Sequence, residues 1–98
     1  MLNIFYRWAP EALKRLPHGV AASLTSGGQT ADPAARLDFD APTRIGRITC
    51  WDSGSFYAEV LDVESGDNLL GQHGRFDSAA SLSQLLQTLL DKLHPASL

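Results

Sequence analysis

The sequence of 98 residues has a single cysteine, a slight excess of acidic side chains and no long apolar run. Cys50 cannot form a disulfide within the chain, which suits a reducing cytosol better than a small secreted domain. The net charge of -3 disfavours a nucleic-acid partner, because such partners require a basic face. No stretch approaches the roughly 20 apolar residues of a membrane span, and the first residues lack the pattern of a signal peptide. We therefore expect a cytoplasmic protein that binds neither nucleic acid nor a membrane.

The remaining composition is that of one folded domain spanning residues 1–98. An apolar fraction of 44% argues against wholesale disorder, and a chain this short accommodates one hydrophobic core. Apolar side chains at helical spacing predict an N-terminal helix over residues 1–17, with Pro10 tolerated if it falls in the first turn. Residues 18–35 are small and polar. We interpret them as an irregular connection with room for one short apolar strand near residues 20–24.

An alternating pattern begins at Arg36 and predicts an antiparallel sheet over residues 36–76. Two turns within it look alike, residues 52–54 and residues 64–66, and each ends in a glycine suited to a left-handed backbone. The pattern therefore predicts a four-stranded meander. Its exposed edges would be the first strand and the segment at residues 69–75, and either edge could pair with a partner strand or a second copy.

The first turn fixes the register of the central hairpin, because a slip by one residue would mix apolar and polar faces. The predicted cross-strand pairs are Trp51 and Ser55, Cys50 and Phe56, Thr49 and Tyr57, Ile48 and Ala58, and Arg47 and Glu59. The second turn extends this register with two pairs, Leu61 and Leu69, and Val60 and Leu70. One face then collects Ile48, Cys50, Phe56, Ala58 and Val60. The opposite face collects Arg47, Thr49, Trp51, Tyr57, Glu59 and Leu61.

The C-terminal part of the chain carries the clearest helical pattern. Its leucines recur at i, i+3, i+4, i+7 and i+11: Leu82, Leu85, Leu86, Leu89 and Leu93. Asp77 or Ser78 can cap this helix and His94-Pro95 can end it, so we predict a helix over residues 78–94. The predicted fold class is α+β: a small four-stranded antiparallel β-meander, a C-terminal helix packed on its apolar face, and an N-terminal helix.

No residues form a convincing catalytic or metal site. Cys50 and His73 fall on opposite faces of the predicted sheet, so we interpret Cys50 as a buried small hydrophobe and not as a nucleophile. The histidines lack zinc-ligand spacing. Asp62, Glu64 and Asp67 surround a turn without the regular spacing of a calcium loop. We predict no catalytic residue, no cofactor and no metal.

The candidate function lies in a protein-binding surface. Aromatic residues and arginine dominate the energetics of many interfaces, and acidic side chains suit a basic partner. The candidate partner-binding residues are Trp51, Asp52, Tyr57, Glu59, Asp62 and Glu64. Two arrangements remain open: either the N-terminal helix covers the face with Trp51 and Tyr57, or that face is free to bind. In both cases we expect the two acidic turns to stay exposed beside it.

The segment at residues 36–93 resembles the TriTu-type immunity proteins. The resemblance is carried by Arg36-Leu37-Asp38-Phe39, by Ile45-Gly46-Arg47-Ile48-Thr49-Cys50-Trp51-Asp52-Ser53-Gly54, by Ala58-Glu59-Val60-Leu61-Asp62, by Ser65-Gly66 and His73, and by the leucine-rich helix. The run Gly-Arg-Ile-Thr-x-Trp-x-Ser-Gly is the most specific of these motifs.

This resemblance implies a non-enzymatic immunity protein that binds and neutralises a cognate bacterial toxin domain. It implies a polymorphic toxin of the Rhs kind, associated with type VI secretion, and an ADP-ribosyltransferase whose active or target-binding cleft is occluded. Two alternatives remain from the residues alone. The first is a non-inhibitory adaptor or chaperone for a secreted effector. The second, ranked last, is an enzyme that reverses a toxin's modification. We expect the free chain to be a monomer or a small homo-oligomer.

Overall fold

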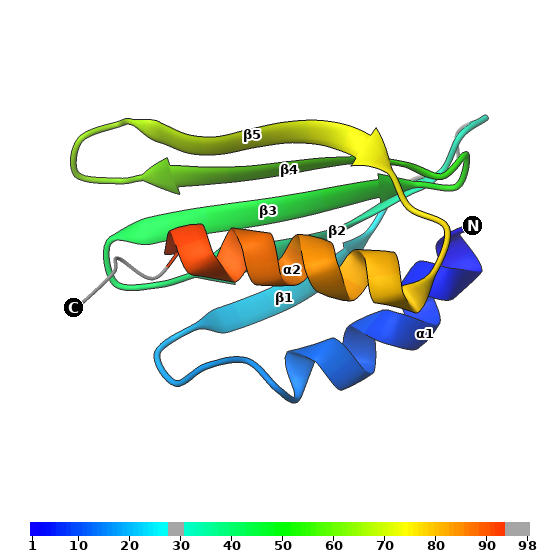
Figure 1. The fold of residues 1–98 in the computed structure, drawn as a ribbon, viewed down its shortest axis with the longest axis horizontal. Helices are drawn as coiled ribbons and strands as arrows, with labels where there is room; N and C mark the ends of the chain where they lie inside the picture. Colours follow the sequence, from blue (N-terminus) through cyan, green and yellow to red (C-terminus); the bar gives the residue numbers. More distant parts are fainter. Residues whose placement is uncertain (28–30, 94–98) are drawn as a thin grey trace.

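The computed structural model describes residues 1–27 and 31–93. In order, the elements are α1 (Leu2–Leu13), β1 (Ala21–Ser26), β2 (Ala34–Asp40), β3 (Arg44–Trp51), β4 (Ser55–Asp62), β5 (Asn68–Arg75) and α2 (Ala79–Leu93). The strands form one antiparallel sheet in chain order, and both helices lie on the same side of it (Figure 1). The α+β class and the meander are therefore confirmed.

The predicted number of strands is wrong, because the sheet has five. Ala21–Ser26 lies in the connection where we allowed for one short strand near residues 20–24, and it forms β1 beside β2, a strand that the predicted four-stranded sheet left out. Nearly all of β1 is exposed. Strand β1 is stabilised mainly by backbone hydrogen bonds to β2. Its sequence therefore needs no regular alternation of apolar and polar residues. As a consequence β2 is an inner strand, and the edges of the sheet are β1 and β5.

Helix α1 lies within the predicted range of residues 1–17 but ends four residues earlier, at Leu13. Since it spans Leu2–Leu13, Pro10 lies well inside the helix and not in its first turn. A proline there leaves the carbonyl of Tyr6, four residues back, without a helical N–H donor. Both Pro10 and Tyr6 are exposed, so water can satisfy that carbonyl.

The predicted register of the central hairpin is confirmed from Arg47 opposite Glu59 to Cys50 opposite Phe56. The second hairpin differs in part. Val60 pairs with Leu70 as predicted, but Leu61 pairs with Asn68 after a register shift, and not with Leu69. The reason lies in the turn, where Asp62 accepts hydrogen bonds from the backbone N–H groups of residues 64 and 65 and so lengthens the loop.

The leucine stripe of α2 is buried against the apolar face of the sheet, as the pattern predicted. The helix approaches β3 closely at Gly46, where a Cβ atom would lie 3.2 Å from a methyl carbon of Leu89. Ser78 caps the helix, because its Oγ accepts a hydrogen bond of 3.1 Å from the N–H of Ser81. A cap of this kind stabilises a helix by about 1 kcal/mol. The predicted end at His94-Pro95 lies outside the described residues.

Helix α1 packs beside α2 on that same face. Phe5 and Ala9 are fully buried, and the indole Nε1 of Trp8 donates a hydrogen bond of 2.9 Å to Ser83 Oγ on α2. The main contacts of α1 are with α2 and β3, and Figure 1 shows both helices in front of the sheet. The arrangement left open by the sequence is thus decided: no described helix covers the face that carries Trp51 and Tyr57.

Candidate functional site

The candidate site is the face of the sheet turned away from both helices, which we call the open face. Strand register places its side chains in rows that run across β2, β3, β4 and β5. One row is Arg36, Thr49, Tyr57 and His73, the next is Asp38, Arg47, Glu59 and Gly71, and the third is Asp40, Ile45, Leu61 and Asn68. Trp51 lies beyond the first row. The open face therefore combines aromatic, charged and apolar side chains in a fixed order.

An aromatic group occupies one end of the open face. The rings of Tyr57 and His73 face one another across β4 and β5, with centroids 4.4 Å apart. Trp51 is half-buried at the end of β3, diagonal to Tyr57. Rigid aromatic side chains lose little rotamer freedom on binding, which is why they serve so often as interface anchors. This end of the face is suited to an apolar contact.

A charged network occupies the middle of the face. Asp38 accepts from Arg47 Nε at 2.7 Å and from Arg36 Nε at 3.0 Å. Partial burial raises the pKa of Asp38, but the hydrogen bonds from Arg47 and Arg36 outweigh it and hold the pKa below its ordinary value. Both arginine side chains are exposed and Asp38 is only partly buried, so the net effect of these ion pairs on stability is small. Their main consequence is that both guanidinium groups are held beside Asp38.

The third row lies at the other end of the face and carries two uncovered apolar residues. Ile45 and Leu61 are 40% and 38% exposed, and they are direct cross-strand partners. Together with Asp40 and Glu59 they line a shallow depression. Our sequence reasoning missed Ile45 and Asp40. Extending the predicted register by two more pairs would have placed Ile45 opposite Leu61 on this face.

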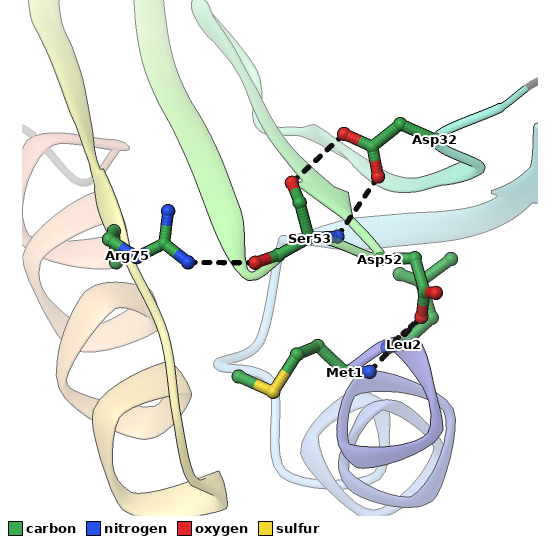
Figure 2. Close-up of polar contacts among 6 residues, drawn as sticks. All are labelled: Met1, Leu2, Asp32, Asp52, Ser53 and Arg75. Carbon is green, nitrogen blue, oxygen red and sulfur yellow. Dashed lines mark hydrogen bonds and ion pairs between the residues drawn. The ribbon is translucent and has the colours of Figure 1, made fainter.

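Asp52, a predicted partner-binding residue, is instead engaged with α1. Its Oδ1 accepts hydrogen bonds from the backbone N–H of Leu2 at 3.0 Å and from the amino group of Met1 at 3.1 Å. The bond from Leu2 is the main cause that lowers the pKa of Asp52. Figure 2 shows this carboxylate beside the first turn of the helix. The carboxylate therefore anchors α1 to the β3–β4 turn. It does not point to the open face of the sheet.

Asp62 and Glu64 lie at the far end of β4 from Asp52, a separation of roughly 25 Å along a strand of this length. Asp62 is bonded to its own turn and lies 3.5 Å from Arg44 Nε, although that nitrogen is not aligned to donate a hydrogen bond. Arg44 in turn donates to the carbonyl of Lys92 at the end of α2. The six predicted residues thus do not form one patch, since only Trp51, Tyr57 and Glu59 share the open face.

The sequence also raised the questions of a reactive cysteine, a metal site and a membrane span. Cys50 is completely buried, and burial raises the pKa of its thiol to about 12, so the reactive thiolate is not formed near neutral pH. Across residues 1–27 and 31–93, no three side chains of the types that bind metals lie close enough to share an ion. Neither described helix has the length and apolar character needed to cross a membrane.

The sequence profile of the family described as "Immunity protein TriTu" matches residues 3–92, which includes all five strands and nearly all of both α1 and α2. The match therefore includes β1 and nearly all of α1 as well as almost the whole segment at residues 36–93. No curated protein matches the chain.

Proposed function

Because the chain belongs to the TriTu family of immunity proteins, we propose that it neutralises a cognate toxin by binding the toxin domain with the open face of its sheet. Membership of the family suggests the neutralising role. The proposed location of the interface, on the open face, is a separate proposal. It goes beyond the family match and rests on the geometry of this chain.

The observation that supports this location is the placement of both helices on one face. The apolar side chains of α1 and α2 are buried against the covered side, while Trp51, Tyr57, Ile45 and Leu61 remain partly or substantially exposed on the other. Exposed apolar and aromatic groups that cluster on one surface are typical of protein interfaces. The charged network between them supplies a polar surround that fixes orientation more than it adds affinity.

The finer proposal concerns the toxin and the mode of inhibition. The resemblance noted in the sequence implies an ADP-ribosyltransferase of a polymorphic, Rhs-type system, and we propose that occlusion of its catalytic or target-binding cleft is the mode of inhibition. A rigid sheet face suits occlusion, because it can cover a cleft with little loss of conformational entropy. The chain itself then needs no catalytic group, and one molecule protects against one toxin domain.

The first prediction concerns the aromatic anchors. Trp51→Ala and Tyr57→Ala should each weaken binding of the toxin domain by about 30-fold, equivalent to about 2 kcal/mol, because each removes an anchor of the interface. The measurement is titration calorimetry with the cognate toxin domain. Tyr6→Ala is the matched control, since Tyr6 is a 39% exposed tyrosine on the helical side.

Two outcomes would contradict the proposal. Binding that is weakened by Tyr6→Ala and not by Tyr57→Ala would place the interface on the helices. Full toxin activity in the saturated complex would instead favour the non-inhibitory adaptor. An activity titration also separates blocking from enzymatic reversal, because a blocking inhibitor must reach roughly one molecule per toxin, whereas an enzyme acts at far lower amounts.

A further inference from the structure

We propose that the depression between Asp40 and Glu59 on the open face accepts an arginine side chain of the toxin domain. This inference rests on the proposed function and deepens it, because it names the chemistry of the partner at one place in the interface. It concerns the end of the open face opposite to the aromatic anchors.

The depression has an apolar part formed by the side chains of Ile45 and Leu61. These two residues are direct neighbours across β3 and β4, and both are well exposed. The depression encloses about 230 Å³, which is room for one long side chain and not for a secondary-structure element. An aliphatic stem laid on Ile45 and Leu61 would remove their exposed surface from water.

The charge of the lining is negative. The residues that line the depression include three carboxylates, from Asp38, Asp40 and Glu59, and one guanidinium, from Arg47. The lining therefore carries three negative charges against one positive charge. Arg47 is already bonded to Asp38 at 2.7 Å. Among the described residues, neither Asp40 nor Glu59 takes part in an ion pair, although Glu59 lies opposite Arg47 across the strands. Two carboxylates beside the apolar pair thus remain available to a cation.

Arginine fits this combination better than the other cationic side chains. Its guanidinium is planar, weakly hydrated and able to donate to two carboxylates at once, whereas the lysine ammonium is a strongly hydrated point charge. A neutral apolar side chain would cover Ile45 and Leu61 but would leave Asp40 and Glu59 to be desolvated without a partner, which is unfavourable. The geometry therefore points to a basic residue with a long aliphatic stem.

The test removes each charge while keeping the shape of the side chain. Asp40→Asn and Glu59→Gln should each weaken binding of the toxin domain about 5-fold, and the double variant about 20-fold, which is the size expected when one ion pair is lost at a largely solvent-exposed site. Their association rates should also depend less on salt concentration. Asp67→Asn is the matched control, because Asp67 is an exposed carboxylate in the β4–β5 turn and does not line the depression.

A second measurement identifies the partner group. Each arginine of the toxin domain is changed to lysine and to alanine, and the affinities are combined with Glu59→Gln in double-mutant cycles. One arginine should show a coupling that corresponds to at least about 3-fold with Glu59, and lysine should restore only part of it. The methyl resonances of Ile45 and Leu61 should shift when the wild-type toxin domain is added.

The outcomes separate this inference from the proposed function. If the wild-type chain binds and inhibits the toxin while Asp40→Asn, Glu59→Gln and the control behave alike, the arginine contact is wrong and the immunity function stands. Coupling to an apolar or acidic toxin residue in place of an arginine would overturn the inference in the same way. Failure of the wild-type chain to bind the toxin at all would overturn both.

Discussion

The two turns that look alike in the sequence have opposite structural roles. Residues 52–54 join β3 to β4, residues 63–67 join β4 to β5, and both turns contain Ser-Gly with the glycine at positive φ. Gly54 is buried, whereas Gly66 is exposed. The difference comes from what surrounds each turn and not from its own residues.

The first turn is bonded to three distant parts of the chain. Ser53 donates to both oxygens of Asp32, from its N–H and its hydroxyl, each at 2.9 Å. The carbonyl of Ser53 accepts from Arg75 Nη2 at 2.8 Å. Asp52 holds the start of α1 (Figure 2). This turn is therefore a junction at which α1, the segment before β2 and the end of β5 meet.

The second turn is bonded mainly to itself. The Oδ1 of Asp62 accepts the N–H groups of Glu64 and Ser65, and the N–H of Asp67 donates to Ser65 Oγ. One bond leads to another loop, from the N–H of Val63 to the carbonyl of Thr43. A turn that is closed on itself leaves its outer side chains, such as Glu64, exposed. An acidic turn in the sequence therefore does not by itself indicate a binding surface.

The largest expected difference between the turns comes from replacing their glycines. Gly54→Ala should lower the free energy of unfolding by about 2–3 kcal/mol, and Gly66→Ala by about 1 kcal/mol. Both alanines would adopt an unfavourable positive φ. Only the Cβ at residue 54 would also crowd neighbours, Arg75 Nη2 at 3.2 Å and Met1 Cε at 3.3 Å, whereas nothing lies within 4 Å of one at residue 66. Urea unfolding monitored by tryptophan fluorescence gives both values.

The two alanine variants act as controls for each other, because the loss of glycine flexibility in the unfolded chain is the same in both. Equal losses of stability would mean that the contacts around residue 54 do not matter. The comparison between a junction and a self-contained turn would then be wrong.

A smaller difference is expected from the polar contacts. Asp32→Ala removes both hydrogen bonds to Ser53 and should cost about 1 kcal/mol, because the turn loses its link to the segment before β2. Ser65→Ala removes the one side-chain bond to Asp67 and should cost no more than about 0.5 kcal/mol at this exposed site. Thermal unfolding measures the loss of overall stability in each variant. Amide exchange at Ser53 shows whether the loss in Asp32→Ala is confined to the first turn. A larger effect from Ser65→Ala would reverse the assignment of the two roles.

The sequence predicted the central hairpin well because period-two alternation is strong where one face is buried. Ile48, Cys50 and Val60 all point to the covered side, so a shift by one residue would expose them. The same reasoning allowed only for a short strand near residues 20–24 and did not place it in the sheet as β1. Its side chains are nearly all exposed, and it is held by backbone pairing that leaves no periodic signal.

The candidate site was predictable only in part for a related reason. Alternation assigns Trp51 and Tyr57 to one face, but it does not say which face a helix will cover. That choice depends on contacts such as Trp8 with Ser83, which are 75 residues apart in the chain. The role of Asp52 likewise depends on Leu2, 50 residues away. Local patterns therefore place side chains on faces, and distant contacts decide which of them remain available.

The smallest expected effect, and the one that separates the two turns most directly, is their response to acid. Hydrogen bonds from Leu2 to Asp52, and from Ser65 to Asp62, lower both pKa values below the ordinary 3.8. A carboxyl with a lowered folded-state pKa contributes stability that is present above the unfolded value and is lost as pH falls through the folded one. The contribution of each should therefore be complete above about pH 5 and disappear below its own pKa.

The location of the loss should differ between the two carboxyls. Carboxyl carbon shifts recorded from pH 6 to pH 2 should give midpoints below 3.8 for both. Protonation of Asp52 should broaden or shift amides at the start of α1, because its bond leads there, whereas protonation of Asp62 should affect only the amides of residues 64 and 65. Asp52→Asn should abolish the response in α1 and leave that of the second turn intact. If α1 instead follows the titration of Asp62, the first turn does not serve as the junction that its contacts describe.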